Sequence, residues 1–120
     1  MSTVDLSRRS APREEPLTVD LTALGRTLES ILGRPGSPAR ELVEERTRRL
    51  AKALRALSGE FSDDDRTAVA ALCRAGRRLL DTPYKPSPAD TDERAWRYLT
   101  DLATVTDGFR ELALQEEGWW

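Results

Sequence analysis

Residues 62–80 read SDDDRTAVAALCRAGRRLL and form the clearest helix pattern in this 120-residue chain. Aspartates stand at the start and arginines near the end, which matches the dipole of a helix at both termini. Ser62 and Asp65 have the spacing of a capping box. The apolar face would consist of Val69, Leu72, Cys73, Leu79 and Leu80. The pattern predicts a helix that opens at Ser62, and Gly76 on the same face would let a neighbouring helix approach closely.

The chain before this stretch predicts two more helices. The first spans about 18–32, with Thr18 or Asp20 as its cap. Its apolar residues recur at spacings of three and four: Leu17, Leu21, Leu24, Leu28, Ile31 and Leu32. The second takes Ser37 as its N-cap and Pro38 as its first helical residue. Its stripe consists of Val43, Leu50, Leu54 and Leu57.

A fourth helix is predicted after residues 81–89, which contain three prolines and cannot continue a helix. It starts at Asp90, with Glu93 completing a capping box, and ends before Gly118. Its apolar face comprises Trp96, Leu99, Leu102, Ala103, Thr106, Phe109, Leu112 and Ala113.

These four amphipathic segments predict an all-α fold, and their short connections favour an antiparallel four-helix bundle. No segment alternates with period two for long enough to predict a strand. We expect residues 1–16 to form a flexible N-terminal arm, residues 17–118 the bundle, and residues 119–120 an aromatic C-terminal tail.

Composition limits the kind of protein this can be. Hydrophobic residues make up 38% of the chain and charged residues 33%, which is typical of a globular protein. The net charge of −2 gives no global attraction to nucleic acid or to an anionic membrane. Cys73 is the single cysteine, so we expect no disulfide partner. With no long apolar run, the sequence indicates a cytoplasmic protein, and its abundant Arg and Ala indicate a GC-rich bacterial genome.

The sequence contains few residues of the types that enzymes use for catalysis. The chain has no histidine, which excludes Ser-His-Asp triads and imidazole zinc sites. Glu41, Glu44 and Glu45 share a helix face, but di-iron bundles also use histidine, so a solvated face paired with arginine is the better interpretation. We expect no catalytic residue, no metal, no cofactor and no enzyme activity. A site built from carboxylates inside the bundle is the alternative.

Aromatic residues are the predicted partner contacts. Trp119 and Trp120 either fold back onto the bundle or bind a partner, and Tyr84 in the proline-rich segment is a further contact. The expected partner is another protein or a second copy of the chain, and we expect no interaction with a membrane.

Residues 38–80 also have the outline of a helix-turn-helix, which would make the chain a DNA-binding regulator. Nucleic acid is disfavoured as a partner, because the recognition helix would begin with three aspartates that repel phosphate.

The basic helix in this segment can instead pair with an acidic helix of the same chain. Residues 40–55 carry six cations against three carboxylates, a net +3, whereas residues 90–118 carry three against eight, a net −5. We expect these two helices to be neighbours.

The stretch Phe61–Leu80, with its acidic start and its Arg-Arg-Leu ending, resembles a family of small helical natural product biosynthesis proteins of GC-rich bacteria. Residues 95–112 are similar in outline to the last helix of that family, although Thr106-Asp-Gly-Phe109 replaces its Cys-Asp-His-Tyr-like ending. The resemblance implies a helical accessory protein without assigned catalytic residues. Together these observations predict a non-catalytic interaction or accessory protein, with the DNA-binding regulator as the alternative.

Overall fold

Four helices and two short strands make up the computed structural model, which describes residues 3–5, 18–33, 38–81 and 85–116. The elements are β1 Thr3–Asp5, β2 Thr18–Asp20, α1 Leu21–Leu32, α2 Arg40–Glu60, α3 Thr67–Leu80 and α4 Asp92–Glu116. Helix dominates the described chain, so the predicted all-α class is confirmed. No helix in the described ranges is both long and apolar enough to cross a membrane.

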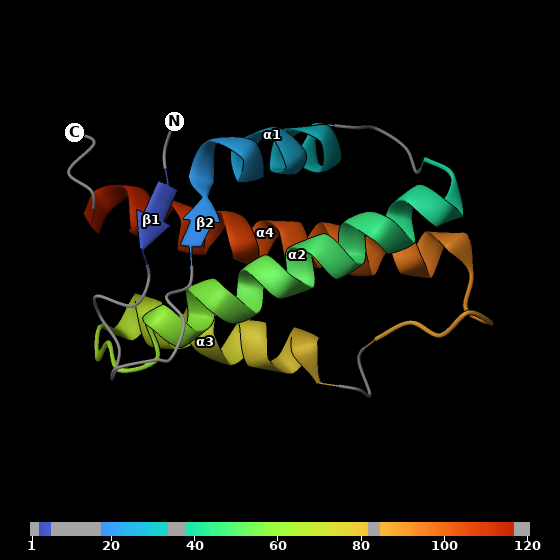
Figure 1. Cartoon of the computed structure of the whole chain (residues 1–120). Helices are drawn as coiled ribbons and strands as arrows, with labels where there is room; N and C mark the ends of the chain where they lie inside the picture. Colours follow the sequence, from blue (N-terminus) through green and yellow to red (C-terminus); the bar gives the residue numbers. More distant parts are fainter. Residues whose placement is uncertain (1–2, 6–17, 34–37, 82–84, 117–120) are drawn as a thin grey trace.

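Helix α4 is the centre of the fold, because it packs against each of the other three helices. Helix α2 crosses it with the most extensive contact, and the two run in the same direction (Figure 1). Helix α1 lies on one side of this pair and α3 on the other (Figure 1). The predicted neighbourhood of the basic helix α2 and the acidic helix α4 is therefore confirmed.

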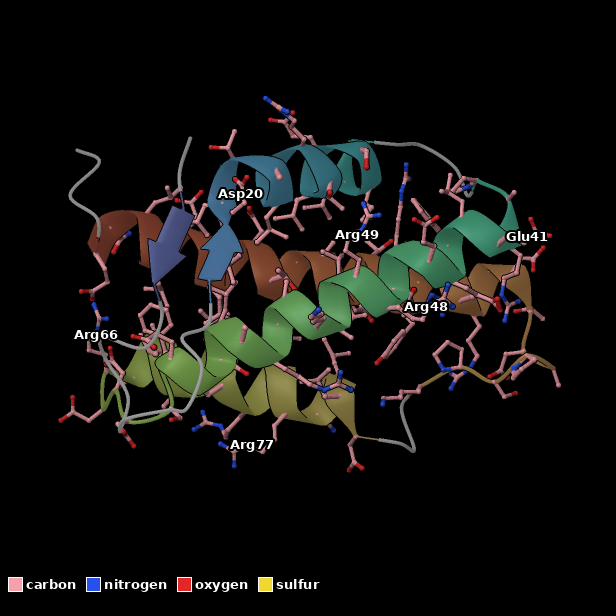
Figure 2. All side chains as sticks on the ribbon, in the orientation of Figure 1. Asp20, Glu41, Arg48, Arg49, Arg66 and Arg77 are labelled. Atoms are coloured by element: carbon pink, nitrogen blue, oxygen red, sulfur yellow. The ribbon has the colours of Figure 1, made fainter. Side chains whose placement is uncertain are left out.

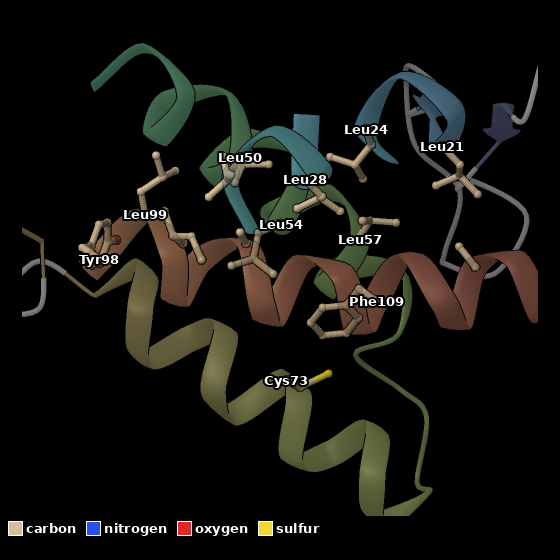
Figure 3. Packing of buried hydrophobic residues seen from close by; sticks show 14 of the residues in the cluster. Leu21, Leu24, Leu28, Leu50, Leu54, Leu57, Cys73, Tyr98, Leu99 and Phe109 are labelled. Carbon is tan, nitrogen blue, oxygen red and sulfur yellow. The ribbon is translucent and has the colours of Figure 1, made fainter. Parts of the chain in front are cut away.

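Most of the predicted apolar positions form the core (Figure 3). Partly buried residues packed against it are Leu72, Leu79, Leu80, Trp96 and Leu112. Leu50, Leu54, Leu99 and Phe109 are fully buried. The other buried side chains of the core are Leu21, Leu24, Leu28, Ile31, Val43, Leu57, Phe61, Val69, Cys73, Ala95, Tyr98, Leu102, Ala103 and Ala113. Leu32 was predicted to lie on the buried face of its helix, but the structure shows that it is 41% exposed. Leu17 lies outside the described residues.

The start of α1 differs from the prediction, because residues 18–20 form strand β2 instead of the first helical turn. Strand β1 pairs with it antiparallel, so the expectation of no strand was wrong, and residues 3–5 of the predicted N-terminal arm belong to a two-stranded ladder. Valine and threonine favour extended backbone, which explains both strands. Asp20 ends β2 and caps α1 as predicted: its Oδ1 accepts from the amides of Thr22 and Ala23 at 3.1 Å each. The rest of the arm lies outside the described residues.

The start of α3 also differs from the prediction, because the helix begins at Thr67 and not at Ser62. The Asp64 carboxylate accepts from the Arg66 amide at 3.0 Å and from its guanidinium at 2.6 Å, which holds this segment as a turn. Phe61 is buried with its ring stacked on Phe109 at 6.0 Å between centroids, which fixes the end of α2. The capping box of Ser62 and Asp65 does not form.

The starts of α2 and α4 lie two residues later than predicted. Helix α2 begins at Arg40, after an N-cap at Ala39, so Pro38 precedes the helix, and Ser37 is outside the described residues. In α4, Thr91 is the capping side chain: its Oγ1 accepts from the Arg94 amide at 3.1 Å. Asp90 instead accepts from the Ser87 amide at 2.6 Å, and this bond lowers the pKa of its carboxyl.

Gly76 has the packing role that the sequence predicts. A Cβ at this position would lie 3.3 Å from Leu54 Cδ1, so the glycine lets α3 approach α2 closely. Gly108 does the same for α4, where a Cβ would lie 2.9 Å from Leu72 Cδ2. Both glycines sit where two helices touch, and a larger residue there would force a side chain or a helix to move.

Candidate functional site

The three aromatic residues predicted as partner contacts, Tyr84, Trp119 and Trp120, lie outside the described residues. The ionisable and nucleophilic side chains within the described ranges are the other candidates for a functional site.

The carboxylates of α2 lie on the helix surface beside arginines. Glu45 pairs with Arg49 at 3.0 Å, and Glu44 lies 3.7 Å from Arg40. Glu41 is exposed (Figure 2). Within the described ranges, no three or more His, Cys, Asp or Glu side chains gather closely enough to hold a metal ion. These contacts agree with the predicted solvated face.

Cys73 is buried in the core, as the apolar pattern of α3 predicts (Figure 3). Its Sγ lies 3.7 Å from the carbonyl oxygen of Phe61, to which the thiol donates. Burial raises the pKa of the thiol, and the nearby positive charge of Arg77 opposes this only in part. A protonated, buried thiol is a packing group and a poor nucleophile.

The helix-turn-helix segment does not present a basic helix end to a groove. Asp63 and Asp65 are exposed in the turn before α3, whereas Arg77 and Arg78 stand in its last turn. Helix α3 also packs against both α2 and α4, with Val69, Cys73 and Gly76 turned inward. DNA binding remains a prediction that these contacts do not favour.

A groove lies between α1 and α2, and residues of β2 also line it. Its volume is about 500 Å³. The lining residues are Val19, Asp20, Ala23, Leu24, Thr27, Arg49, Lys52, Ala53, Arg55 and Ala56. We call this feature the α1–α2 groove. It exists because α1 packs chiefly on α4, which leaves α1 and α2 as two walls with little direct contact.

Both walls of the α1–α2 groove have the same geometry. The first wall consists of positions 23, 24 and 27 of α1 together with its N-cap Asp20, and on α2 the lining positions include 49, 52, 53 and 56. Each set follows the i, i+3, i+4, i+7 spacing of one helix face. Ala23, Ala53 and Ala56 keep the walls small, and Leu24 supplies an apolar surface. The small residues on both walls leave a surface that a further helix can contact closely.

Cations border the α1–α2 groove along α2. Figure 2 shows Arg49 on the side of α2 that faces α1, whereas Arg48 lies away from it. Arg49 is paired with Glu45, but Lys52 and Arg55 have no acidic partner in the described part of the chain. The Asp20 carboxylate is engaged in capping α1. The border is therefore net positive around an apolar interior.

No protein-family model matches this chain, and no curated protein or solved structure does either. The resemblance noted in the sequence remains a prediction.

A second groove, of about 520 Å³, lies between α2, the proline-rich segment and the start of α4. Two of its polar side chains are already engaged in holding the fold together. Arg40 donates to the carbonyl oxygens of Ser87 and Asp90, and the Tyr98 hydroxyl donates to the carbonyl oxygen of Leu79. Burial raises the pKa of Tyr98, so its hydroxyl stays a neutral donor. This groove is a less suitable binding site than the α1–α2 groove.

The sequence interpretation missed the α1–α2 groove, although a signal was present. Thr27, Ala23 and Ala53 flank the leucine stripes and were not assigned a role. A second face of small residues beside an apolar stripe marks a helix with two contact surfaces. Which helix such a face meets depends on the packing of α1 on α4, and the periodicity of one helix does not contain that information.

Proposed function

We propose that this chain is a non-catalytic interaction or accessory protein, and that its α1–α2 groove binds an amphipathic helix of a protein partner. The observation that carries the proposal is the pair of matching stripes on α1 and α2, which form an apolar groove with a cationic border. Helix-in-groove recognition uses anchor residues with this same spacing.

The dimensions of the groove suit a short helical segment. The lining positions on α2 from 49 to 56 extend along about 10 Å of helix, roughly two turns. A partner helix would place apolar side chains at i, i+3 or i+4, and i+7 against Leu24 and the alanines. Acidic residues beside this stripe would face Lys52 and Arg55, which gives the interaction its charge selectivity.

Several broader predictions form part of the same proposal. We propose that the four helices act as one bundle in which consecutive helices run antiparallel, supported by the reversal of chain direction at each helix connection (Figure 1). Trp119, Trp120 and Tyr84 are proposed as additional contacts for the partner or for a second copy of the chain. A cytoplasmic location in a GC-rich bacterium and a role in natural product biosynthesis are proposed from the composition and the resemblance.

The proposal is tested with two model peptides of about four helical turns, ~14 residues. Both carry leucines at i, i+3 or i+4, and i+7, and they differ only in having Glu or Lys beside this stripe. Fluorescence anisotropy should show that the Glu peptide binds and the Lys peptide does not. Raising the salt concentration should weaken binding, because the cations at the border are exposed.

Matched variants localise the peptide to the groove. Lys52→Glu should weaken binding of the Glu peptide about fivefold, the size expected for reversing one exposed charge pair. Arg48→Glu makes the same charge change on the same helix outside the α1–α2 groove, and it should have little effect. Ala23→Trp should block the groove, whereas Ala68→Trp at an exposed position of α3 should not.

Two results would contradict the proposal. One is equal binding of the two peptides, and the other is equal weakening by Lys52→Glu and Arg48→Glu. A gel shift at low salt distinguishes the DNA-binding alternative. If the chain shifts DNA and both Lys52→Glu and Arg48→Glu abolish the shift, α2 binds nucleic acid. The DNA-binding alternative then replaces the helix-in-groove proposal.

A further inference from the structure

The two strands of this protein have the same sequence. The chain reads Thr-Val-Asp-Leu at residues 3–6 and again at 18–21. The first three residues of each copy form β1 and β2. In the antiparallel ladder Thr3 is opposite Asp20, Val4 is opposite Val19, and Asp5 is opposite Thr18. The pairing is therefore centred on the two valines, and each half of the ladder repeats the other.

This symmetry means that β1 is not unique as a partner of β2. A second copy of β2 placed antiparallel in the same register would make the same backbone ladder, with Val19 opposite Val19 of the second copy. A ladder of three residue pairs is marginal by itself. What favours β1 is that residues 6–17 tie it to β2 in the same chain.

We infer that the edge of β2 covered by β1 is a self-association site, whose occupant in the dimer is β2 of a second copy of this chain. β1 is then an internal competitor that keeps two copies apart. The inference rests on the repeated sequence and its register, and it does not depend on what binds the α1–α2 groove.

The antiparallel geometry separates the two helical bodies in such a dimer. Helix α1 follows β2 directly at Asp20, so it leaves the ladder at the end where Thr18 of the second copy stands. The second α1 leaves from the opposite end. Figure 1 shows that β1 and β2 lie at the start of α1 and beside the end of α4, and β2 also contacts α2. The result is a closed two-fold dimer with one shared strand pair.

Competition by β1 sets the expected concentration dependence. A short intrachain connection gives an effective concentration on the order of 1 mM. At a chain concentration of about 0.1 mM the internal strand then has at least a tenfold advantage over a second copy, because β2 of that copy must also release its own β1. Deleting residues 1–5 should remove this advantage, and the concentration at which half of the chains are dimeric should fall at least tenfold.

The experiment compares the full chain with the chain lacking residues 1–5 by light scattering across a concentration series. Circular dichroism establishes that both are folded. Val4→Gly in the full chain provides a second test, because glycine weakens a strand without shortening the chain. A peptide containing residues 1–8 should return the dimer of the truncated chain to monomer.

Single cysteines report the register of the dimer. In a Cys73→Ala background of the truncated chain, Val19→Cys should give a disulfide-linked dimer, because directly opposed strand residues have Cα atoms about 4.5–5.5 Å apart. Thr18→Cys is the matched control, since Thr18 would lie opposite Asp20 of the other copy and far from its own equivalent. The inference is overturned if the truncated chain and the Val4→Gly variant stay monomeric, or if the two cysteine variants cross-link equally. Peptide binding in the α1–α2 groove is measured separately and can fail or succeed without affecting this result.

Discussion

Thr106 shows at the scale of one residue how a helix pattern can place a polar group in the core. Its side chain is 0% exposed on α4, and its Oγ1 has no hydrogen-bond partner among the described residues. A buried hydroxyl without a partner loses its hydration and gains nothing in return. Thr106→Val keeps the shape of the side chain and removes the hydroxyl. We expect it to raise the free energy of unfolding by about 1–2 kcal/mol, measured by urea denaturation.

Thr104 is the control for this substitution, because it lies on the same helix but is exposed. Its Oγ1 donates to the Thr100 carbonyl oxygen at 2.9 Å. Thr104→Val should change the free energy of unfolding by less than about 0.5 kcal/mol. If Thr106→Val lowers the urea midpoint instead, the hydroxyl has a stabilising role and the packing argument for this position is wrong.

At the scale of elements, one arginine joins the start of α2 to the start of α4. Arg40 donates to the carbonyl oxygens of Asp90 and Ser87 at 2.9 and 3.1 Å, and to the Asp92 carboxylate at 3.0 Å. A lysine cannot reproduce this planar fork of donors. Arg40→Lys should therefore destabilise the first turn of α4 by about 1–2 kcal/mol, seen as faster amide hydrogen exchange in residues 85–95.

Arg97→Lys makes the same change where the arginine holds a single exposed carboxylate. Arg97 pairs with Glu93 at 3.2 Å within α4, an arrangement that a lysine can also form. This variant should leave the exchange of residues 85–95 unchanged. If amide exchange in residues 85–95 becomes faster by the same factor in both variants, Arg40 acts only through its charge. Its hydrogen bonds to the loop then do not stabilise the start of α4.

The limits of sequence prediction also appear at this scale. The stripe from Val43 to Leu57 was predictable because periodicity is repeated over several turns and does not depend on any one residue. Helix ends depend on a local competition between side chains for backbone groups, and this is why Asp64 holds a turn where Ser62 was expected to cap. Strand β2 was missed because three residues are too few to show alternation, although the repeated Thr-Val-Asp was visible. The α1–α2 groove depends on how separate helices pack, which no single stripe encodes.

At the scale of the whole molecule, the central position of α4 makes α1 the helix that depends most on a single helical neighbour. Helices α2 and α3 each pack against α4 and against one another, whereas α1 packs chiefly on α4. Arg110 Nε donates to the Leu21 carbonyl oxygen at 2.8 Å and is a specific tie between α1 and α4. We expect α1 to open locally, with amide protection at least tenfold lower than in α2 and α4, as measured by hydrogen exchange with mass spectrometry.

Helix α3 is the internal comparison for this prediction, because it is of similar length to α1 but packs on two helices. Its protection should exceed that of α1. A partner helix in the α1–α2 groove would contact both walls and supply the second surface that α1 lacks. The Glu peptide should therefore slow exchange in α1 more than in α3, and Lys52→Glu should reduce this effect. If amide protons of α1 and α4 exchange at the same rate in the free protein, α1 opens only when the whole molecule unfolds. The α1–α2 groove is then rigid before the partner helix binds.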